Sequence, residues 1–217
     1  MNPLSKIAAA SVLAVSIFSS NAGTLVLDFE GIANATAIGS FYNGVGGPDY
    51  NITFGPNALA LVDSDAGGGG NFGHEPSPDT IMFFLTGSAV LNVPDGFDTG
   101  FSFFYSSPFA TGNVNVWSGM NGTGTLLGSF PLGTTPQDGG DPNGSYSPFV
   151  PIGIEFEGIA MSVDFQGAAN NIGFDNITFG DSVPEGAESP VPEPSTVIGG
   201  ITLAGLAASK MLRRKKA

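Results

Sequence analysis

Short apolar runs separated by turn-forming residues restrict the folds open to this chain more than any other feature of its sequence. Between residues 24 and 180 each run has four to eight residues and stops near Gly, Pro, Asn or Asp. No run repeats with the period of an amphipathic helix, and runs of this length are typical of β-strands. The predicted strands are 24–30, 51–54, 58–62, 80–85, 88–93, 101–106, 113–118, 125–130, 159–165 and 172–179.

Alternation within the runs indicates sheets with one buried face. Val114 and Val116 alternate with two asparagines, so only the valines are expected to enter a core. Turn signals such as Pro94-Asp95-Gly96 and Asn121-Gly122 separate the runs. Many short strands joined by glycine-rich turns predict that residues 23–180 form an all-β domain, a jelly-roll-like β-sandwich.

The first 22 residues have the three parts of a secretory signal peptide. Lys6 supplies the positive charge, residues 7–18 are apolar, and Ser20-Asn21-Ala22 offers the small residues at which such peptides are cleaved. We therefore expect residues 1–22 to direct export through the Sec pathway, and the mature protein to begin near Gly23.

The C-terminal region has a linker followed by a candidate membrane segment. Residues 181–191 are rich in proline and lack apolar periodicity, which is typical of a linker. Residues 192–217 contain Pro192-Glu193-Pro194, an apolar stretch at 197–212 and a basic tail. The stretch predicts a single, short transmembrane helix, with the basic tail on the cytoplasmic side of the inner membrane. The tail consists of Arg213, Arg214, Lys215 and Lys216.

This order of motif, membrane helix and basic tail resembles the PEP-CTERM sorting signal of Gram-negative bacteria. The resemblance implies that an exosortase, a membrane-embedded cysteine protease or transpeptidase, processes the chain at or near Pro192, Glu193 and Pro194. It also implies transient anchoring in the inner membrane before delivery to the cell surface or extracellular matrix, in a setting of exopolysaccharide production, biofilm or floc formation. A plain membrane anchor with a proline-rich stalk is the alternative.

Charge is distributed very unevenly along the chain. Between Gly23 and Pro190 there are eighteen Asp or Glu residues and no Lys or Arg, so this segment has a formal charge of −18. Nucleic acids and anionic lipids bind proteins through Lys and Arg, and we expect the segment to bind neither. Divalent cations prefer oxygen ligands and are expected to be attracted instead. The chain has no cysteine, which excludes disulfides and cysteine-based metal sites.

The predicted domain is also similar to jelly-roll carbohydrate-binding modules. In those modules a first strand with Phe-Glu and a last strand with Asp lie side by side and share a structural calcium ion. Asp28-Phe29-Glu30-Gly31 and Phe174-Asp175-Asn176-Ile177 match these positions. The resemblance implies calcium at Glu30 and Asp175, with Asp28 or Asp164 and backbone carbonyl groups completing the oxygen shell. The alternative is that these carboxylates are solvated or cap turns.

Tyrosine and tryptophan rings are candidates for stacking on sugars, because each has a large apolar face and a polar edge. Tyr42, Tyr50 and Tyr146 lie beside Gly, Asn and Pro in predicted loops, so they are the predicted glycan-binding residues. Tyr105 and Trp117 lie in strongly patterned strands and are expected in the core.

Catalysis has weaker support in the sequence. His74 is the only histidine, so it offers too few nitrogen ligands for a zinc site. Glu155 and Glu157 alternate along one strand and form the best pair of acids for a glycosidase. We expect a non-enzymatic surface or matrix protein that binds or organises extracellular polysaccharide. A self-associating acidic surface protein without sugar recognition is the second hypothesis, and a weak glycoside hydrolase is the third.

Overall fold

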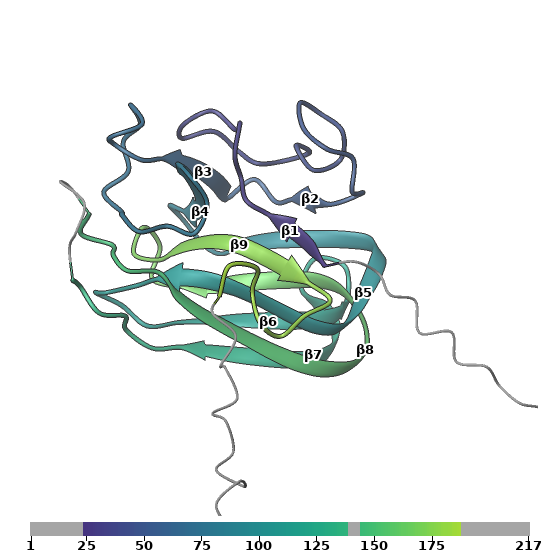
Figure 1. The fold of residues 1–217 in the computed structure, drawn as a ribbon. Helices are drawn as coiled ribbons and strands as arrows, with labels where there is room; N and C mark the ends of the chain where they lie inside the picture. The colour runs from purple at the N-terminus through teal and green to yellow at the C-terminus, as the bar shows by residue number, and fades with distance from the viewer. Residues whose placement is uncertain (1–23, 139–143, 188–217) are drawn as a thin grey trace, which may run out of the picture. The chain divides into compact units, whose positions relative to one another are not determined.

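All regular structure in the computed structural model, which describes residues 24–138 and 144–187, is β-strand (Figure 1). The described part of the chain holds no helix that is long and apolar enough to cross a membrane. The predicted signal peptide, sorting motif, membrane helix and basic tail lie outside the described residues. The strands are β1 (Leu25–Leu27), β2 (Thr53–Phe54), β3 (Ala58–Val62), β4 (Thr80–Phe84), β5 (Ala89–Ser106), β6 (Gly112–Gly119), β7 (Thr123–Leu132), β8 (Val150–Gly167) and β9 (Gly173–Phe179).

The strands form two layers because the two longest strands, β5 and β8, bend together. They pair along both halves, and register shifts between Asn92 and Thr99 mark the bend. The β6 layer contains β2, the first half of β5, the second half of β8, β6 and β7. The β9 layer contains β3, β4, β1, β9, the second half of β5 and the first half of β8. All pairings between these strands are antiparallel, and the two layers confirm the predicted all-β sandwich.

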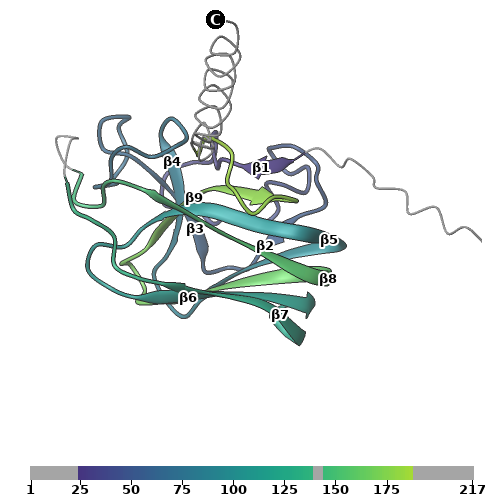
Figure 2. The ribbon, with the colours of Figure 1, turned by 60° about the horizontal axis from the view of Figure 1, so that its bottom comes forward.

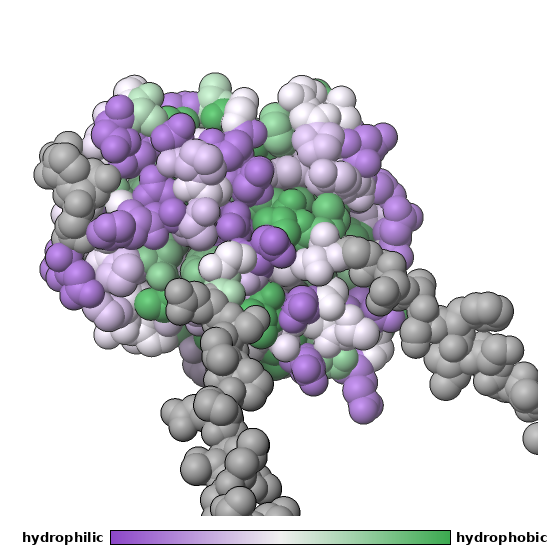
Figure 3. All heavy atoms as spheres, in the orientation of Figure 1, coloured by the Kyte–Doolittle hydropathy of each residue, from purple (hydrophilic) through white to green (hydrophobic). Residues whose placement is uncertain are grey.

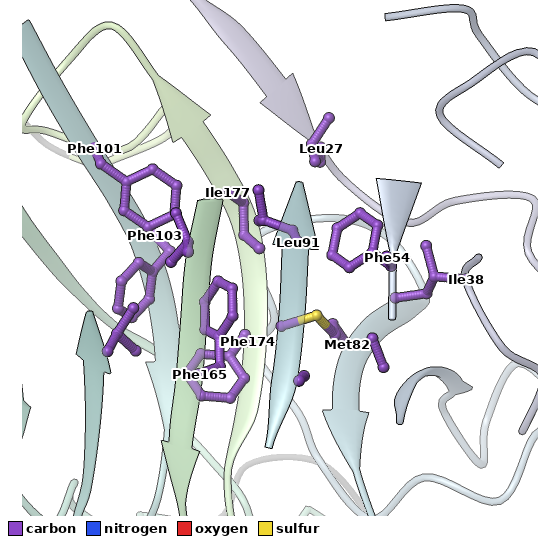
Figure 4. Packing of buried hydrophobic residues seen from close by; sticks show 14 of the residues in the cluster. Leu27, Ile38, Phe54, Met82, Leu91, Phe101, Phe103, Phe165, Phe174 and Ile177 are labelled. Carbon is purple, nitrogen blue, oxygen red and sulfur yellow. The ribbon is translucent and has the colours of Figure 1, made fainter. Parts of the chain in front are cut away.

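Phenylalanine dominates the core between the layers (Figure 4). Phe165 of β8 lies 5.9 Å from Phe103 of β5 and 4.9 Å from Phe174 of β9, measured between ring centroids. None of these three side chains has exposed surface. The core found among the described residues lies entirely between Leu27 and Phe179. A fragment of residues 24–187 therefore contains this whole core and is the sample for the experiments below.

Two strands are longer than the sequence predicts. Pro94-Asp95-Gly96 was expected to form a turn, but β5 continues through it, because the register shifts let the strand bulge out of the pairing while it bends. β8 begins at Val150, although Pro151 and Gly153 weaken its sequence signal. By contrast, Asn121-Gly122 forms the predicted turn between β6 and β7, with φ values of 58° and 67°.

The chain that follows β9 lies on the outer face of the β9 layer. The Ser102 hydroxyl donates to the carbonyl oxygen of Asp181 at 2.9 Å, and the Glu185 N–H donates to the Thr178 hydroxyl at 3.1 Å. Gly153 makes room for this segment, because a Cβ atom there would overlap the carbonyl oxygen of Ser182. Residues 181–185, at the start of the predicted linker, are thus bound to the sandwich.

Replacing Gly153 by alanine should lower the free energy of unfolding by about 1–3 kcal/mol, because the added methyl group must displace the backbone at Ser182. Cleavage after Glu185 by a glutamate-specific protease should become faster as the segment detaches. Thermal unfolding and a proteolysis time course measure the two effects. Gly133→Ala is the matched control, since no atom lies within 4 Å of its added Cβ. Equal behaviour of the two variants would contradict the account.

Candidate functional site

The first and last strands lie side by side, as the calcium prediction required. β1 pairs with β9, Leu25 opposite Phe179 and Leu27 opposite Ile177. β1 ends at Leu27, earlier than predicted, because the chain turns at Phe29, whose φ is 63°. The Phe29 N–H donates to the hydroxyl oxygen of Tyr42 at 2.6 Å. This bond satisfies a buried backbone donor that the end of the strand leaves unpaired.

Ser77 joins the carboxylates of Glu30 and Asp175. Asp175 Oδ2 accepts hydrogen bonds from the Ser77 N–H at 3.0 Å and from the Ser77 hydroxyl at 2.8 Å. The same hydroxyl oxygen lies 3.2 Å from Glu30 Oε1. That Glu30 oxygen also accepts bonds from the N–H groups of Asp79 at 2.9 Å and Thr80 at 2.8 Å. We call Glu30, Ser77 and Asp175 the Ser77 cluster.

Burial dominates the electrostatics of this cluster. Asp175 has no exposed surface, and this burial raises the pKa of its carboxyl group to about 8. The negative charge of Glu30 adds to the rise in pKa, while the hydrogen bonds from Ser77 and Asn176 oppose it. At neutral pH Asp175 is therefore mostly protonated. Once protonated, the Asp175 carboxyl group can donate to the Ser77 hydroxyl oxygen, and the Ser77 hydroxyl can then donate its own hydrogen to Glu30 instead of to Asp175.

The calcium ligands implied by the sequence come together only in part. The oxygens of Glu30 and Asp175 face N–H and O–H donors, and Asp28 is exposed, with Oδ1 accepting the Glu30 N–H at 3.2 Å. Asp164 lies in the β6 layer, where it pairs with Asn115, so it is wrong as a ligand of this cluster. Among the described residues no three acidic or histidine side chains gather to hold a metal ion. Of the implied ligands only Glu30 and Asp175 come together, so calcium binding at this cluster stays a prediction.

Thermal unfolding in calcium and in EDTA tests that prediction. Binding at Glu30 and Asp175 would raise the melting temperature of the fragment by mass action, because calcium would bind the folded state alone. The rise should disappear in Asp175→Asn and persist in Asp65→Asn, a change at an exposed acid outside the cluster. Equal melting temperatures in calcium and EDTA would contradict the prediction and leave the hydrogen-bonded cluster as a purely structural device.

The three predicted glycan-binding tyrosines do not form one platform. Tyr42 is 2 % exposed and packs against Phe29 at 6.1 Å between ring centroids, so the prediction is wrong for this residue. Its loop folds back onto the core, where the hydroxyl group accepts the Phe29 N–H. Tyr50 is 42 % exposed and stacks on Tyr42, with ring planes 14° apart. Tyr146 belongs to a different segment, which bridges to Phe72.

Tyr146 stands at the rim of a small, largely apolar pit of about 40 Å³. Its hydroxyl donates to the carbonyl oxygen of Asn170 at 3.3 Å, and its N–H donates to the carbonyl oxygen of Asn71 at 3.1 Å. Phe109, 54 % exposed, meets the Tyr146 ring edge to face at 5.4 Å. The pit is lined by Leu61, Asn71, Phe72, Ile81, Phe83, Tyr146, Asn170, Ile172 and Gly173. We call Tyr146, Phe109, Asn71 and Asn170 the Tyr146 rim.

The acids considered for catalysis lie on an open surface. Glu155 and Glu157 are exposed on β8 and line a wide groove of about 610 Å³ together with Asp181 and Ser182. A glycosidase needs two different environments, so that one carboxyl group stays protonated while the other is ionised. Glu155 and Glu157 are both exposed, so no difference in burial gives them different environments. His74 lies with Nδ1 3.0 Å from the Ser147 hydroxyl oxygen, away from this groove's lining residues.

Sequence reasoning missed the residues that complete both sites. Ser77 lies between two prolines, and no pattern marks it as the partner of an acid ninety-eight residues away. Phe109 follows Pro108 in a predicted loop, and its position in that loop is a sequence feature that indicates an exposed ring. Of the two aromatic residues expected in the core, Tyr105 is buried, whereas Trp117 is only partly buried.

No known family model matches the chain, and no curated protein resembles it in sequence. Solved structures with similarity include a family 6 carbohydrate-binding module, at 16% identity and a TM-score of 0.38, covering 60% of this chain and 87% of that one. Another is the carbohydrate-binding module of lichenase 5A from Cellvibrio mixtus in complex with cellotriose, at 12% identity and a TM-score of 0.33. That match covers 57% of this chain and 86% of the module. A third is the K1 cleaved adhesin domain of Lys-gingipain from Porphyromonas gingivalis W83, at 15% identity and a TM-score of 0.39. That match covers 72% of this chain and 97% of the adhesin domain. Similarity this low carries no argument about ligands.

Proposed function

We propose that this protein is an exported, non-enzymatic component of the cell surface or extracellular matrix, whose jelly-roll-like sandwich binds extracellular polysaccharide. In this proposal an exosortase processes the chain at Pro192-Glu193-Pro194 after transient anchoring in the inner membrane. The support for sorting is the order of motif, apolar stretch and basic tail in the sequence. The support for polysaccharide binding is the Tyr146 rim.

The Tyr146 rim carries the proposal because it presents aromatic and amide groups on a rigid support. Tyr146 is held from both sides, by backbone bonds to Asn71 and Gly73 and by its hydroxyl bond to Asn170. A ring fixed in this way loses little conformational entropy when a ligand covers it. Amide groups at the edge can exchange hydrogen bonds with sugar hydroxyl groups, and the apolar pit can take a methyl or methylene group.

The charge of the domain narrows the ligand class to neutral polysaccharides. Hydrophilic residues cover most of the face drawn in Figure 3, and the described chain contains Asp and Glu but no Lys or Arg. A polyanion would meet this negative field without a cation to pair with. Stacking and neutral hydrogen bonds, by contrast, need no positive charge. We therefore expect binding to uncharged glucans or mannans, and none to alginate.

Affinity electrophoresis of the 24–187 fragment tests the proposal. Gels that contain xyloglucan, glucomannan or mixed-linkage glucan should retard the fragment, and gels with alginate should not. Tyr146→Ala and Phe109→Ala should each weaken the retarding interaction by about tenfold, because they remove the ring faces at the rim. Val45→Ala changes a 68 % exposed side chain in another loop and should have no effect.

Two outcomes would redirect the proposal. Loss of binding in Tyr50→Ala, with normal binding in Tyr146→Ala, would move the ligand to the Tyr42–Tyr50 stack. Free migration in every neutral gel would contradict polysaccharide binding of this class. The self-associating surface protein would then be the better account, and an open strand edge, described next, is the observation that favours it.

A further inference from the structure

A long neutral stretch interrupts the otherwise acidic chain. No charged residue or histidine occurs between Asp98 and Asp138, a stretch that contains the second half of β5 and all of β6 and β7. The other described strands and loops are flanked by Asp or Glu and contain no Lys or Arg. Two copies of this chain therefore repel each other over most of their surfaces, and least where this stretch is exposed.

Most strand edges of the sandwich are protected from pairing with another chain. At β3, the Ala60 N–H donates to the Thr36 carbonyl oxygen and the Ala60 carbonyl oxygen accepts the Ala35 N–H, both at 2.9 Å. At β2, the Phe54 N–H donates to the Gly39 carbonyl oxygen at 2.7 Å. β1 has only three residues. Capping segments and short edge strands are recognised protections against edge-to-edge association.

The first half of β8, at the edge of the β9 layer, is protected by its side chains. Pro151 removes one backbone donor, and Glu155 and Glu157 are exposed there. A second copy of this edge would bring like charges together. Proline and charged residues on an edge strand are further protections of the same kind.

β7 lacks these protections except at its two ends. It is the last strand of the β6 layer, and within the described residues it pairs with β6 alone (Figure 2). Residues 123–126 and 129 are exposed, and Leu126 is 47 % exposed. Pro131 removes a donor near one end of the strand, and register shifts in the pairing with β6 disturb the other end, before Gly128. Between Leu126 and Phe130, the backbone N–H and C=O groups that face away from β6 have no strand partner among the described residues, so they offer a template for another strand.

We infer that two copies of this chain pair through β7, antiparallel and related by a twofold axis, so that the two β6 layers form one continuous sheet. A second copy fits this edge because it presents an identical neutral strand, whereas pairing through β8 would oppose its own glutamates. Each copy has one open edge of this kind among its described strands. The twofold contact uses up both edges, so assembly stops at the dimer.

The acidic bodies give the dimer a characteristic salt dependence. Glu157 is next to Gly158 of β8, and a Cβ atom on Gly158 would contact the Leu127 side chain of β7, so the Glu157 charge lies near the interface. Added salt screens the repulsion between the acidic groups of the two copies. Dimerisation should therefore strengthen as ionic strength rises, opposite to an interface held by ion pairs.

Sedimentation equilibrium of the 24–187 fragment, from micromolar to submillimolar protein, tests the inference. The fragment should form dimers, more tightly at about 500 mM than at about 50 mM NaCl. Leu126→Glu with Ser129→Glu should weaken dimerisation by at least about tenfold, because each copy then brings two negative charges to the shared edge. The matched control is Val45→Glu with Leu85→Glu, which adds the same charge at exposed apolar residues outside β7 and should dimerise like the parent fragment.

Cysteine cross-linking gives a second measurement if the charged β7 variant fails to fold. The chain has no cysteine, so single variants Thr125→Cys, Leu126→Cys and Ser129→Cys report only on intermolecular contact. At least one should form a disulfide-linked dimer under mild oxidation, and Val45→Cys should not. A fragment that stays monomeric in high salt would overturn the inference. So would dimers whose affinity is unchanged by the charged β7 substitutions and that cross-link no better through β7 cysteines than through Val45→Cys.

Discussion

Replacing Phe165 by alanine is expected to lower the free energy of unfolding by about 3–5 kcal/mol. The ring has no exposed surface and connects the two layers, since it comes from β8 in the β6 layer and meets Phe103 and Phe174 of the β9 layer. Its removal loses the transfer free energy of the ring and leaves a cavity whose walls are aromatic rings from two sheets. Such walls can close the gap only by moving whole strands.

Urea denaturation of the 24–187 fragment measures this effect. Phe109→Ala is the control with the same chemical change, because Phe109 is 54 % exposed and should cost less than about 1 kcal/mol. A loss of similar size in the two variants would show that Phe165 does not hold the layers together as the structure indicates.

The stability of the domain should fall as pH rises from about 4 to about 8, and Asp175 should be a main cause. Its pKa is raised from 3.8 to about 8 by burial, so between these values the folded state binds a proton that the unfolded state has released. Stability therefore decreases with pH across this window, by up to about 1.4 kcal/mol per pH unit from this group. Below about pH 4 both states are protonated and its contribution is fully present.

Asp175→Asn isolates this contribution, because the amide cannot ionise. Measured in EDTA by urea denaturation at several pH values, the parent fragment should lose stability relative to the variant as pH rises. At acidic pH the variant should be the weaker protein, since its amide cannot accept all the bonds from Ser77 and Asn176. Asp98→Asn, at an exposed acid, should leave the slope unchanged. Parallel pH curves for Asp175→Asn and its parent would contradict a buried, protonated Asp175.

The alternation of apolar and polar residues made most strands predictable. β3 has the predicted bounds, and Val114 and Val116 are buried between partly exposed asparagines. The bends were not predictable, because proline and glycine occur both in turns that end a strand and in bulges where a strand bends from one layer into the other. Pro94-Asp95-Gly96 interrupts the pattern of β5 as a turn would, and only its continued pairing with β8 shows that it is a bulge.

The candidate sites were predictable only where they depend on strand order. Glu30 and Asp175 were expected together because the first and last strands of such a sandwich are neighbours, and Ser77 does join them. The residue that joins them comes from a loop, and loop conformation leaves no periodic signal in sequence. The same is true of Tyr42, whose neighbours indicate an exposed loop although that loop folds back onto Phe29.

The position of β9 determines when the domain can close. β9 is the last of the described strands, yet it forms the middle of its layer and pairs with β1, β4 and β5. β1, β4 and β5 are synthesised before β9, and none of them can form its pairing with β9 until that strand has been made. The sandwich therefore cannot be completed before the chain reaches Phe179. A chain threaded through a membrane from its N-terminus, as the export proposal requires, would stay unfolded and passable until translocation is nearly finished. Late closure of this kind delays the folding that would otherwise block a translocation pore.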